Sequence, residues 1–218
     1  MAAKKVAVIL SGCGVYDGAE IYESTLTLLA LEQAGAEYQC MAPNIDQLHV
    51  INHLTGEESA ETRNVLVEAA RLARGNIIDL AEANANDYDA LIIPGGFGAA
   101  KNLSTFAVDG TSMKLNADVA AMVKSVHEQG KPVGLICIAP AMSPLLFGDG
   151  VECTIGNDAD TAAAINTLGG NHKECPVDDC VVDSARKVVT TPAYMLAGKI
   201  SEAAAGINKL VKEVMALA

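Results

Sequence analysis

The residue with the clearest chemical potential is Cys137, which ends a short apolar run. Residues 132–136 (PVGLI) follow a Gly-Lys turn signal and have the character of a buried strand. Residues 138–142 (IAPAM) then favour the opening of a helix. A nucleophile at such a strand-to-helix turn stands above the sheet edge, where neighbouring backbone N–H groups can stabilise negative charge. The alternative is a packed cysteine, since this residue type is often buried.

A double glycine, Gly95-Gly96, comes shortly after another apolar run, residues 90–93. We expect its backbone to lie beside Cys137 at the same edge of the sheet. Backbone N–H groups in a glycine turn after a parallel strand can point above the sheet. We therefore expect the N–H groups of Gly96 and Ile138 to form an oxyanion hole, with Gly95 and Asn102 nearby as site-lining residues. The segment lacks the Gly-Lys-Ser/Thr sequence of a phosphate-binding loop. A tight turn without chemistry is the alternative.

A glycine-rich loop after the first apolar run should reach the same edge of the sheet. It contains Cys13 and leads to Glu20 at the start of a predicted helix over residues 19–34. Glu20 is either a catalytic base or an ordinary first-turn acid favoured by the helix dipole. Cys13 either packs beneath the site or resolves an oxidised Cys137 as a second thiol. The G-x-G-x-x-x-G spacing of the loop departs from the dinucleotide-binding pattern.

Apolar runs alternate with helical periodicities along the whole chain, which predicts one α/β domain over residues 1–218. We expect a doubly wound, mostly parallel sheet with helices on both faces, and a ligand outside the carboxyl ends of its strands. The predicted strands are 5–10, 38–41, 76–80, 90–93, 133–136 and a hairpin over 181–190. The main predicted helices are 19–34, 59–72, 116–129, 158–168 and 195–217.

Composition excludes several classes of function. A net charge of −12 argues against nucleic-acid binding, which needs basic surface. No apolar run is long enough to cross a membrane, and no secretory signal is recognised at the start of the chain. The six cysteines show no C-x-x-C pair, so we expect free thiols and no metal. These features favour a cytoplasmic protein.

Several motifs together resemble the PfpI-like branch of the class I glutamine amidotransferase-like superfamily, and more narrowly its ElbB group. That group comprises isoprenoid-biosynthesis proteins that are also described as glyoxalases. The resemblance implies a flavodoxin-like fold, a homodimer and no cofactor. The matching segments, spread over nearly the whole chain, are LSGCGVYDGAEIYE, INHLTGE, TRNVL, PGGFGAAKNL, CIAPAM and VTTPAYM.

The resemblance also implies a reaction on a small dicarbonyl or aldehyde. Glyoxalase III-type relatives convert methylglyoxal or glyoxal and water to a hydroxy acid. In this chain the Cys137 thiolate would add to the aldehyde, giving a hemithioacetal. Glu20 would then move a proton between neighbouring carbons, and Gly96 and Ile138 would hold the oxyanion.

The departures from the family pattern leave other functions open. Amidotransferases and many PfpI-like hydrolases place a histidine beside or shortly after the nucleophile, where this chain has Ile138 and residues 154–156 (TIG). His172 is the remaining candidate. Without a Cys–His pair, amidase or protease chemistry loses its proton donor. The alternative to a lyase is a non-enzymatic regulatory or redox-sensing protein, linked to isoprenoid biosynthesis. Such a protein would keep the strand-to-helix turn at Cys137 for its reactive thiol.

Overall fold

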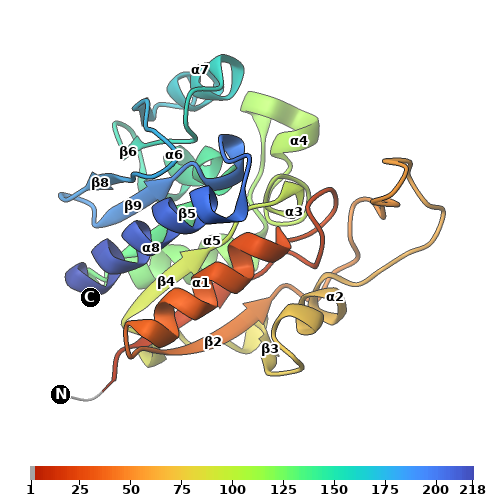
Figure 1. The fold of residues 1–218 in the computed structure, drawn as a ribbon, viewed down its shortest axis with the longest axis horizontal. Coiled ribbons are helices and arrows are strands. Elements are labelled where there is room, and N and C mark those ends of the chain that lie inside the picture. Colours follow the sequence, from red (N-terminus) through yellow and green to blue (C-terminus); the bar gives the residue numbers. More distant parts are fainter. Residues whose placement is uncertain (1–2) are drawn as a thin grey trace.

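Seven strands form one mostly parallel sheet, as the alternation of apolar runs predicts. The structure is a computed structural model and describes residues 3–218. The strand order is β3-β2-β1-β4-β5-β9-β8, and every neighbouring pair is parallel except β8 with β9 (Figure 1). The strands are β1 Lys5–Ile9, β2 Glu37–Ala42, β3 Ile77–Asp79, β4 Ala90–Ile93, β5 Val133–Ile136, β8 Val181–Asp183 and β9 Val188–Thr191.

Helices cover both faces of this sheet, which confirms the predicted flavodoxin-like α/β architecture. Side chains alternate between the faces of a strand, so Val6 and Val8 of β1 pack on one side and Ala7 and Ile9 on the other. One face is covered by α1 (Ile21–Gln33), α2 (Val65–Leu72) and α8 (Ile200–Leu217). The other is covered by α3 (Phe97–Lys101), α5 (Ala117–Glu128) and α6 (Ser143–Phe147).

Smaller elements surround the carboxyl ends of the central strands. These are α4 (Phe106–Asp109), α7 (Ala159–Thr167) and a two-stranded sheet of β6 (Glu152–Cys153) and β7 (Asn171–His172). Residues 43–64 leave the body as a long excursion at the right of Figure 1. Within residues 3–218, no helix is both long and apolar enough to cross a membrane.

Several helix boundaries differ from the predicted ones. The helix predicted over 195–217 begins only at Ile200, because residues 193–195 form a separate 3₁₀ turn. The helix expected directly after Cys137 is a 3₁₀ turn, Ala139–Met142, followed by α6. The helix predicted from residue 59 begins at Val65, where Asn64 caps it.

Helix α8 packs closely against the sheet because two glycines leave room for it. A Cβ added to Gly134 of β5 would lie 3.0 Å from Leu210 Cδ2 of α8. A Cβ added to Gly206 of α8 would lie 2.5 Å from the Val177 carbonyl oxygen and 2.6 Å from Thr191 Oγ1. The second approach involves backbone, which cannot rotate aside.

We therefore predict that Gly206→Ala destabilises the protein, although alanine is the better helix former. The crowded Cβ should lower the free energy of unfolding by about 1–3 kcal/mol, as overpacking does elsewhere. Gly198→Ala is the matched control, because its Cβ would meet nothing closer than 3.7 Å. Urea unfolding of both variants measures the difference, and a Gly206→Ala protein at least as stable as wild type would contradict this account.

Candidate active site

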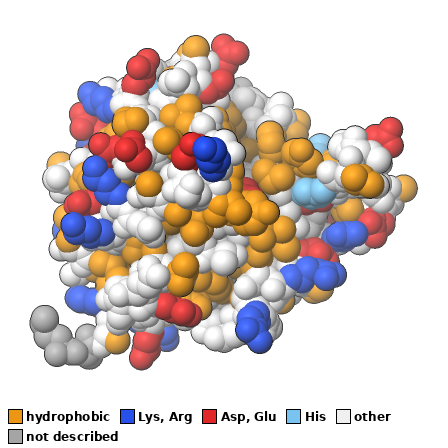
Figure 2. All heavy atoms as spheres, viewed as in Figure 1, with side chains coloured by type: hydrophobic (Ala, Val, Ile, Leu, Met, Phe, Trp, Pro, Cys, Tyr) orange, Lys and Arg blue, Asp and Glu red, His pale blue; other side chains and the backbone are white. Residues whose placement is uncertain are grey.

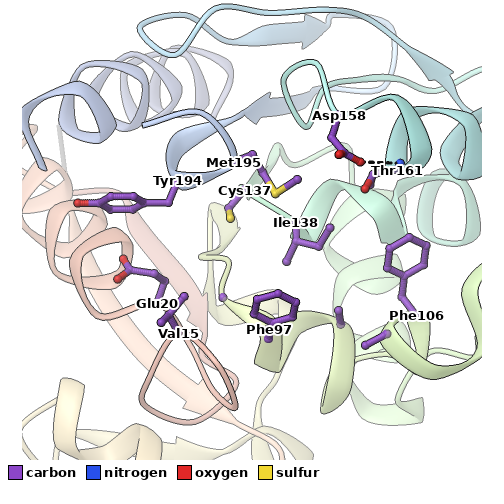
Figure 3. Close-up of a pocket in the computed structure, with 13 residues that line it drawn as sticks. Val15, Glu20, Phe97, Phe106, Cys137, Ile138, Asp158, Thr161, Tyr194 and Met195 are labelled. Atoms are coloured by element: carbon purple, nitrogen blue, oxygen red, sulfur yellow. Dashed lines mark hydrogen bonds between the residues drawn. The ribbon is translucent and has the colours of Figure 1, made fainter. Parts of the chain in front are cut away.

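Cys137 occupies a strained turn directly after β5. Its φ of 63° lies in the left-handed region, which is rare for a residue with a Cβ. The backbone is held there because the Cys137 N–H donates to the Thr191 carbonyl at 2.9 Å. The side chain is 7% exposed and faces the cavity drawn in Figure 3. This is the geometry of a nucleophile elbow.

The carboxyl group that contacts the thiol belongs to Glu23, not to the predicted Glu20. Glu23 is fully buried on α1 beside Cys137, and each of these two side chains shifts the pKa of the other. Its Oε2 accepts from the Gly95 N–H at 2.9 Å, and its Oε1 accepts from the Tyr194 N–H at 3.1 Å. Burial raises the pKa of Glu23 to about 7, outweighing these hydrogen bonds.

Two backbone N–H groups point at the Cys137 sulfur, and they are those of Gly96 and Ile138. They favour the thiolate, whereas burial and the neighbouring Glu23 charge disfavour it. The net effect is a Cys137 pKa well above its usual range. At neutral pH the thiol therefore keeps its proton while Glu23, titrating near 7, can accept one.

The close approach of these groups requires glycine at position 95. A Cβ there would lie 2.4 Å from the Cys137 Cβ and 2.8 Å from Glu23 Oε2. Since β4 and β5 are hydrogen-bonded neighbours, the glycine turn after one strand lies beside the elbow after the other. Gly95 thus lies against the thiol, as expected of a residue at the site.

Glu20 lies at the edge of the site and caps α1. Its Oε2 accepts from the Glu23 N–H at 2.7 Å, which is the usual contact of an N-cap side chain. Glu20 also lines the cavity, and burial raises its pKa. Within residues 3–218, no hydrogen bond joins Glu20 to the Cys137 side chain.

A cavity of about 420 Å³ lies in front of Cys137. Its walls come from the first loop, the turn after β4, the elbow, α4, the start of α7 and the 3₁₀ turn Ala193–Met195. Figure 3 shows these side chains around the open centre, and Figure 2 shows hydrophobic side chains gathered in the middle of the face that it displays. Most of the wall is apolar.

Cys13, Gly95 and Asn102 were predicted to line the site, but none of them is part of the cavity wall. Asn102 is buried, and its Nδ2 donates to the carbonyls of Ser11 and Asp17, both at 2.9 Å. It therefore fixes the first loop and does not face the cavity. Cys13 is half-buried and absent from the cavity wall; burial, followed by the charge of Glu68 on α2, raises its pKa.

No histidine supports the thiol, although all four lie in the part of the chain that the structure describes. His172 belongs to β7, and its Nε2 accepts from the Ile155 N–H at 3.2 Å. Across residues 3–218 there is also no group of three or more His, Cys, Asp or Glu side chains that could hold a metal ion. The described site brings together the thiol, the carboxyl groups of Glu20, Glu23 and Asp158, and backbone N–H groups.

Sequence reasoning missed Glu23, because the buried face of α1 is not its most apolar face. Positions 23, 27, 30 and 31 are buried in the structure, whereas the apolar residues Ile21 and Leu29 are exposed. An acid on the buried face has an unusual environment, because carboxyl groups are seldom fully buried without partners. The aromatic wall residue Phe106 was missed as well.

Comparison with known proteins identifies the class. Residues 4–197 match the model of the DJ-1/PfpI family, and the chain belongs to that family. A crystal structure of an isoprenoid biosynthesis protein with an amidotransferase-like domain from Ehrlichia chaffeensis shares the fold, with a TM-score of 0.92 and 34% identity over 99% of each chain. Glyoxalase III from Candida albicans superposes with a TM-score of 0.60 at 16% identity, which shows the common fold alone.

Curated relatives are more similar in sequence. A human protein, glutamine amidotransferase-like class 1 domain-containing protein 3, mitochondrial, is 48% identical over 99% of this chain and 84% of its own length. The rat ES1 protein homolog, mitochondrial, is 48% identical over 98% of this chain and 84% of its own length. Their mitochondrial names contradict the cytoplasmic location expected from the sequence. That expectation was wrong because the absence of a secretory signal bears only on secretion.

The raised pKa of Glu23 predicts a pH-dependent loss of stability. The folded protein holds the Glu23 proton up to about pH 7, whereas the unfolded chain releases it near its usual value of 4.5. Stability from this group is therefore present below pH 4.5 and is lost as pH rises to 7, by up to about 3 kcal/mol. Glu23→Gln should remove that slope from the free energy of unfolding.

Urea unfolding between pH 4.5 and 8 measures the slope in wild type, Glu23→Gln and the control Glu20→Gln. The slope is a better readout than stability at one pH, because a glutamine amide facing backbone donors adds a constant cost. Equal slopes in wild type and Glu23→Gln would contradict the assignment.

Proposed function

We propose that this protein is a cofactor-free, glyoxalase-like lyase that converts 2-oxoaldehydes such as methylglyoxal or glyoxal to hydroxy acids. The single observation that carries the proposal is the buried Glu23 carboxyl beside Cys137: a Cβ added to Gly95 would lie 2.8 Å from Glu23 Oε2 and 2.4 Å from the Cys137 Cβ. Burial raises the pKa of this carboxyl to about 7. A group that titrates near neutral pH can both accept and return a proton during turnover. Family membership and the shared fold with a glyoxalase III support the proposal.

In the first step the Cys137 sulfur attacks the aldehyde carbon. The S–C bond forms, the C=O π bond breaks, and the thiol proton passes to the ionised Glu23. Negative charge moves to the former carbonyl oxygen, and the N–H groups of Gly96 and Ile138 are placed to stabilise it. Return of the proton from Glu23 to that oxygen gives a neutral hemithioacetal.

In the second step a proton moves between neighbouring carbons. Glu23, again ionised, removes the proton from the hemithioacetal carbon, giving an enediolate. Protonation of the adjacent carbon then yields a thioester of the hydroxy acid. One carbon is oxidised and its neighbour reduced within the substrate, so no external oxidant or reductant is needed. Water hydrolyses the thioester, releasing the acid and restoring the thiol.

The base predicted from the sequence was Glu20, and we now assign that role to Glu23. Glu23 contacts the thiol directly, whereas a Glu20 oxygen is committed to capping α1. Glu20 remains part of the cavity wall and contributes a carboxyl group to it. We further propose that the chain belongs to the ElbB group, with which the similar Ehrlichia chaffeensis protein agrees by name, and that it forms a homodimer.

Kinetics of matched variants test the two carboxyl groups against each other. Cys137→Ala should abolish lactate formation from methylglyoxal, because no other described thiol lines the cavity. Glu23→Gln should lower kcat by about 10²–10⁴-fold, the usual loss for a general acid–base group. Glu20→Gln should remain within roughly tenfold of wild type, because Gln keeps an oxygen for the helix cap. Wild-type turnover in Glu23→Gln or Cys137→Ala would refute the mechanism.

One observation also favours the redox-sensing alternative. The N–H groups that point at the Cys137 sulfur would stabilise an oxidised, anionic sulfur as well as an oxyanion. If that role holds, mild peroxide should transfer oxygen selectively to Cys137, with turnover of dicarbonyls negligible. Mass spectrometry of all six cysteines after a peroxide titration measures the selectivity. Oxidation spread evenly over the exposed thiols, or leaving Cys137 reduced, would rule the alternative out.

A further inference from the structure

The cavity is much larger than methylglyoxal. At about 420 Å³ it falls within the range of roughly 300–1,000 Å³ typical of pockets for drug-sized ligands. Methylglyoxal has only a few non-hydrogen atoms and would leave most of this space to water. Two aromatic rings, Phe97 of α3 and Phe106 of α4, stand on the wall beyond Ile138 (Figure 3). Phe97 is 48% exposed and lines both this cavity and a neighbouring hollow.

The titratable side chains on the cavity wall, apart from Cys137 and Tyr194, are all carboxyl groups. Glu20 and Asp158 line the cavity and Glu23 lies beneath it, while no Lys, Arg or His of residues 3–218 is part of the wall. Hydrogen bonds from Thr161 lower the pKa of Asp158, so this carboxyl is ionised at neutral pH. Lys101 is not part of this wall, but it lines a neighbouring hollow that shares Phe97 and Ala107 with the cavity. Its Nζ donates to the Tyr16 carbonyl at 2.8 Å and lies 5.5 Å from the centroid of the Phe97 ring.

From this shape and charge we infer that the substrate is an uncharged 2-oxoaldehyde carrying an aromatic or branched apolar substituent. The substituent would lie against Phe97 and Phe106 while the aldehyde reaches Cys137. Carboxylated and phosphorylated carbonyl compounds are disfavoured, because their charge would enter an acidic cavity without a counter-charge. This inference rests on the proposed function and specifies its substrate class.

The same charges would aid release of the product. The substrate enters uncharged, whereas hydrolysis of the thioester leaves a carboxylate in a cavity whose wall holds the ionised Asp158. Because like charges in a partly desolvated site repel one another, the product is held less tightly than the substrate. An acidic wall thus suits a reaction that turns a neutral carbonyl compound into an acid.

A series of three substrates separates size from charge. Phenylglyoxal should exceed methylglyoxal in kcat/KM by about tenfold or more, since a buried ring contributes at least as much as a few methylene groups. 4-Carboxyphenylglyoxal, similar in size but anionic, should fall about tenfold below phenylglyoxal. Equal values for methylglyoxal and phenylglyoxal, or a preference for the carboxylated compound, would overturn the inference.

Substitutions of single wall residues test which side chains cause the substrate selectivity. Phe106→Ala should remove most of the advantage of phenylglyoxal over methylglyoxal. Val108→Ala is the matched control, because Val108 lies on the same short helix, is 65% exposed and does not line the cavity. Asp158→Asn should reduce discrimination against 4-carboxyphenylglyoxal, and Asn preserves the cap of α7. No change in either selectivity would overturn the proposed placement.

Binding to the inactive Cys137→Ala protein distinguishes this inference from the proposed reaction. Calorimetry should show 2-hydroxyacetophenone, an uncharged analogue, binding about tenfold more tightly than hydroxyacetone or a 4-carboxylated analogue. If this order holds while wild type turns over none of the glyoxals, the proposed function fails and the ligand class stands. If all three bind alike while glyoxals are turned over, the ligand class fails and the reaction stands.

Discussion

The buried contact between Glu23 and Cys137 constrains four separate parts of the chain. Helix α1 must present its third residue to the core, β5 must end in a strained turn, and the turn after β4 must come close enough to donate from Gly95. The 3₁₀ turn at Tyr194 supplies a second donor. A carboxyl group with its pKa near 7 is stable there because both oxygens accept hydrogen bonds.

The proposed aldehyde chemistry matches the groups that lie beside the thiol. Conversion of an oxoaldehyde needs one proton to be taken and returned, first at sulfur and then at carbon, and the pKa of Glu23 near 7 suits both transfers. A cysteine hydrolase commonly uses a histidine to protonate the amine leaving group. No histidine of residues 3–218 lines the cavity.

The fold alone does not determine the reaction, since one α/β scaffold serves relatives with different names and chemistries. Differences in function must come from the wall of the cavity. In this chain that wall is formed by short elements after the central strands, with aromatic rings from α3 and α4 and a carboxylate from the start of α7. These elements set the size and the charge of the cavity, whereas the position of the thiol is set by the turn at Cys137.

The sequence by itself determined the sheet, the elbow and the glycine turn, because these depend on local apolar runs and on parallel strands ending at one edge. Cys137, Gly95 and Gly96 were predicted in this way. Only the tertiary structure decided between Glu20 and Glu23, because that choice depends on how α1 rotates against the sheet and on a backbone N–H from Tyr194, 171 residues away. It likewise decided that Asn102 fixes the first loop and that Phe106 lines the cavity, since contacts between distant segments leave no periodic pattern in either segment.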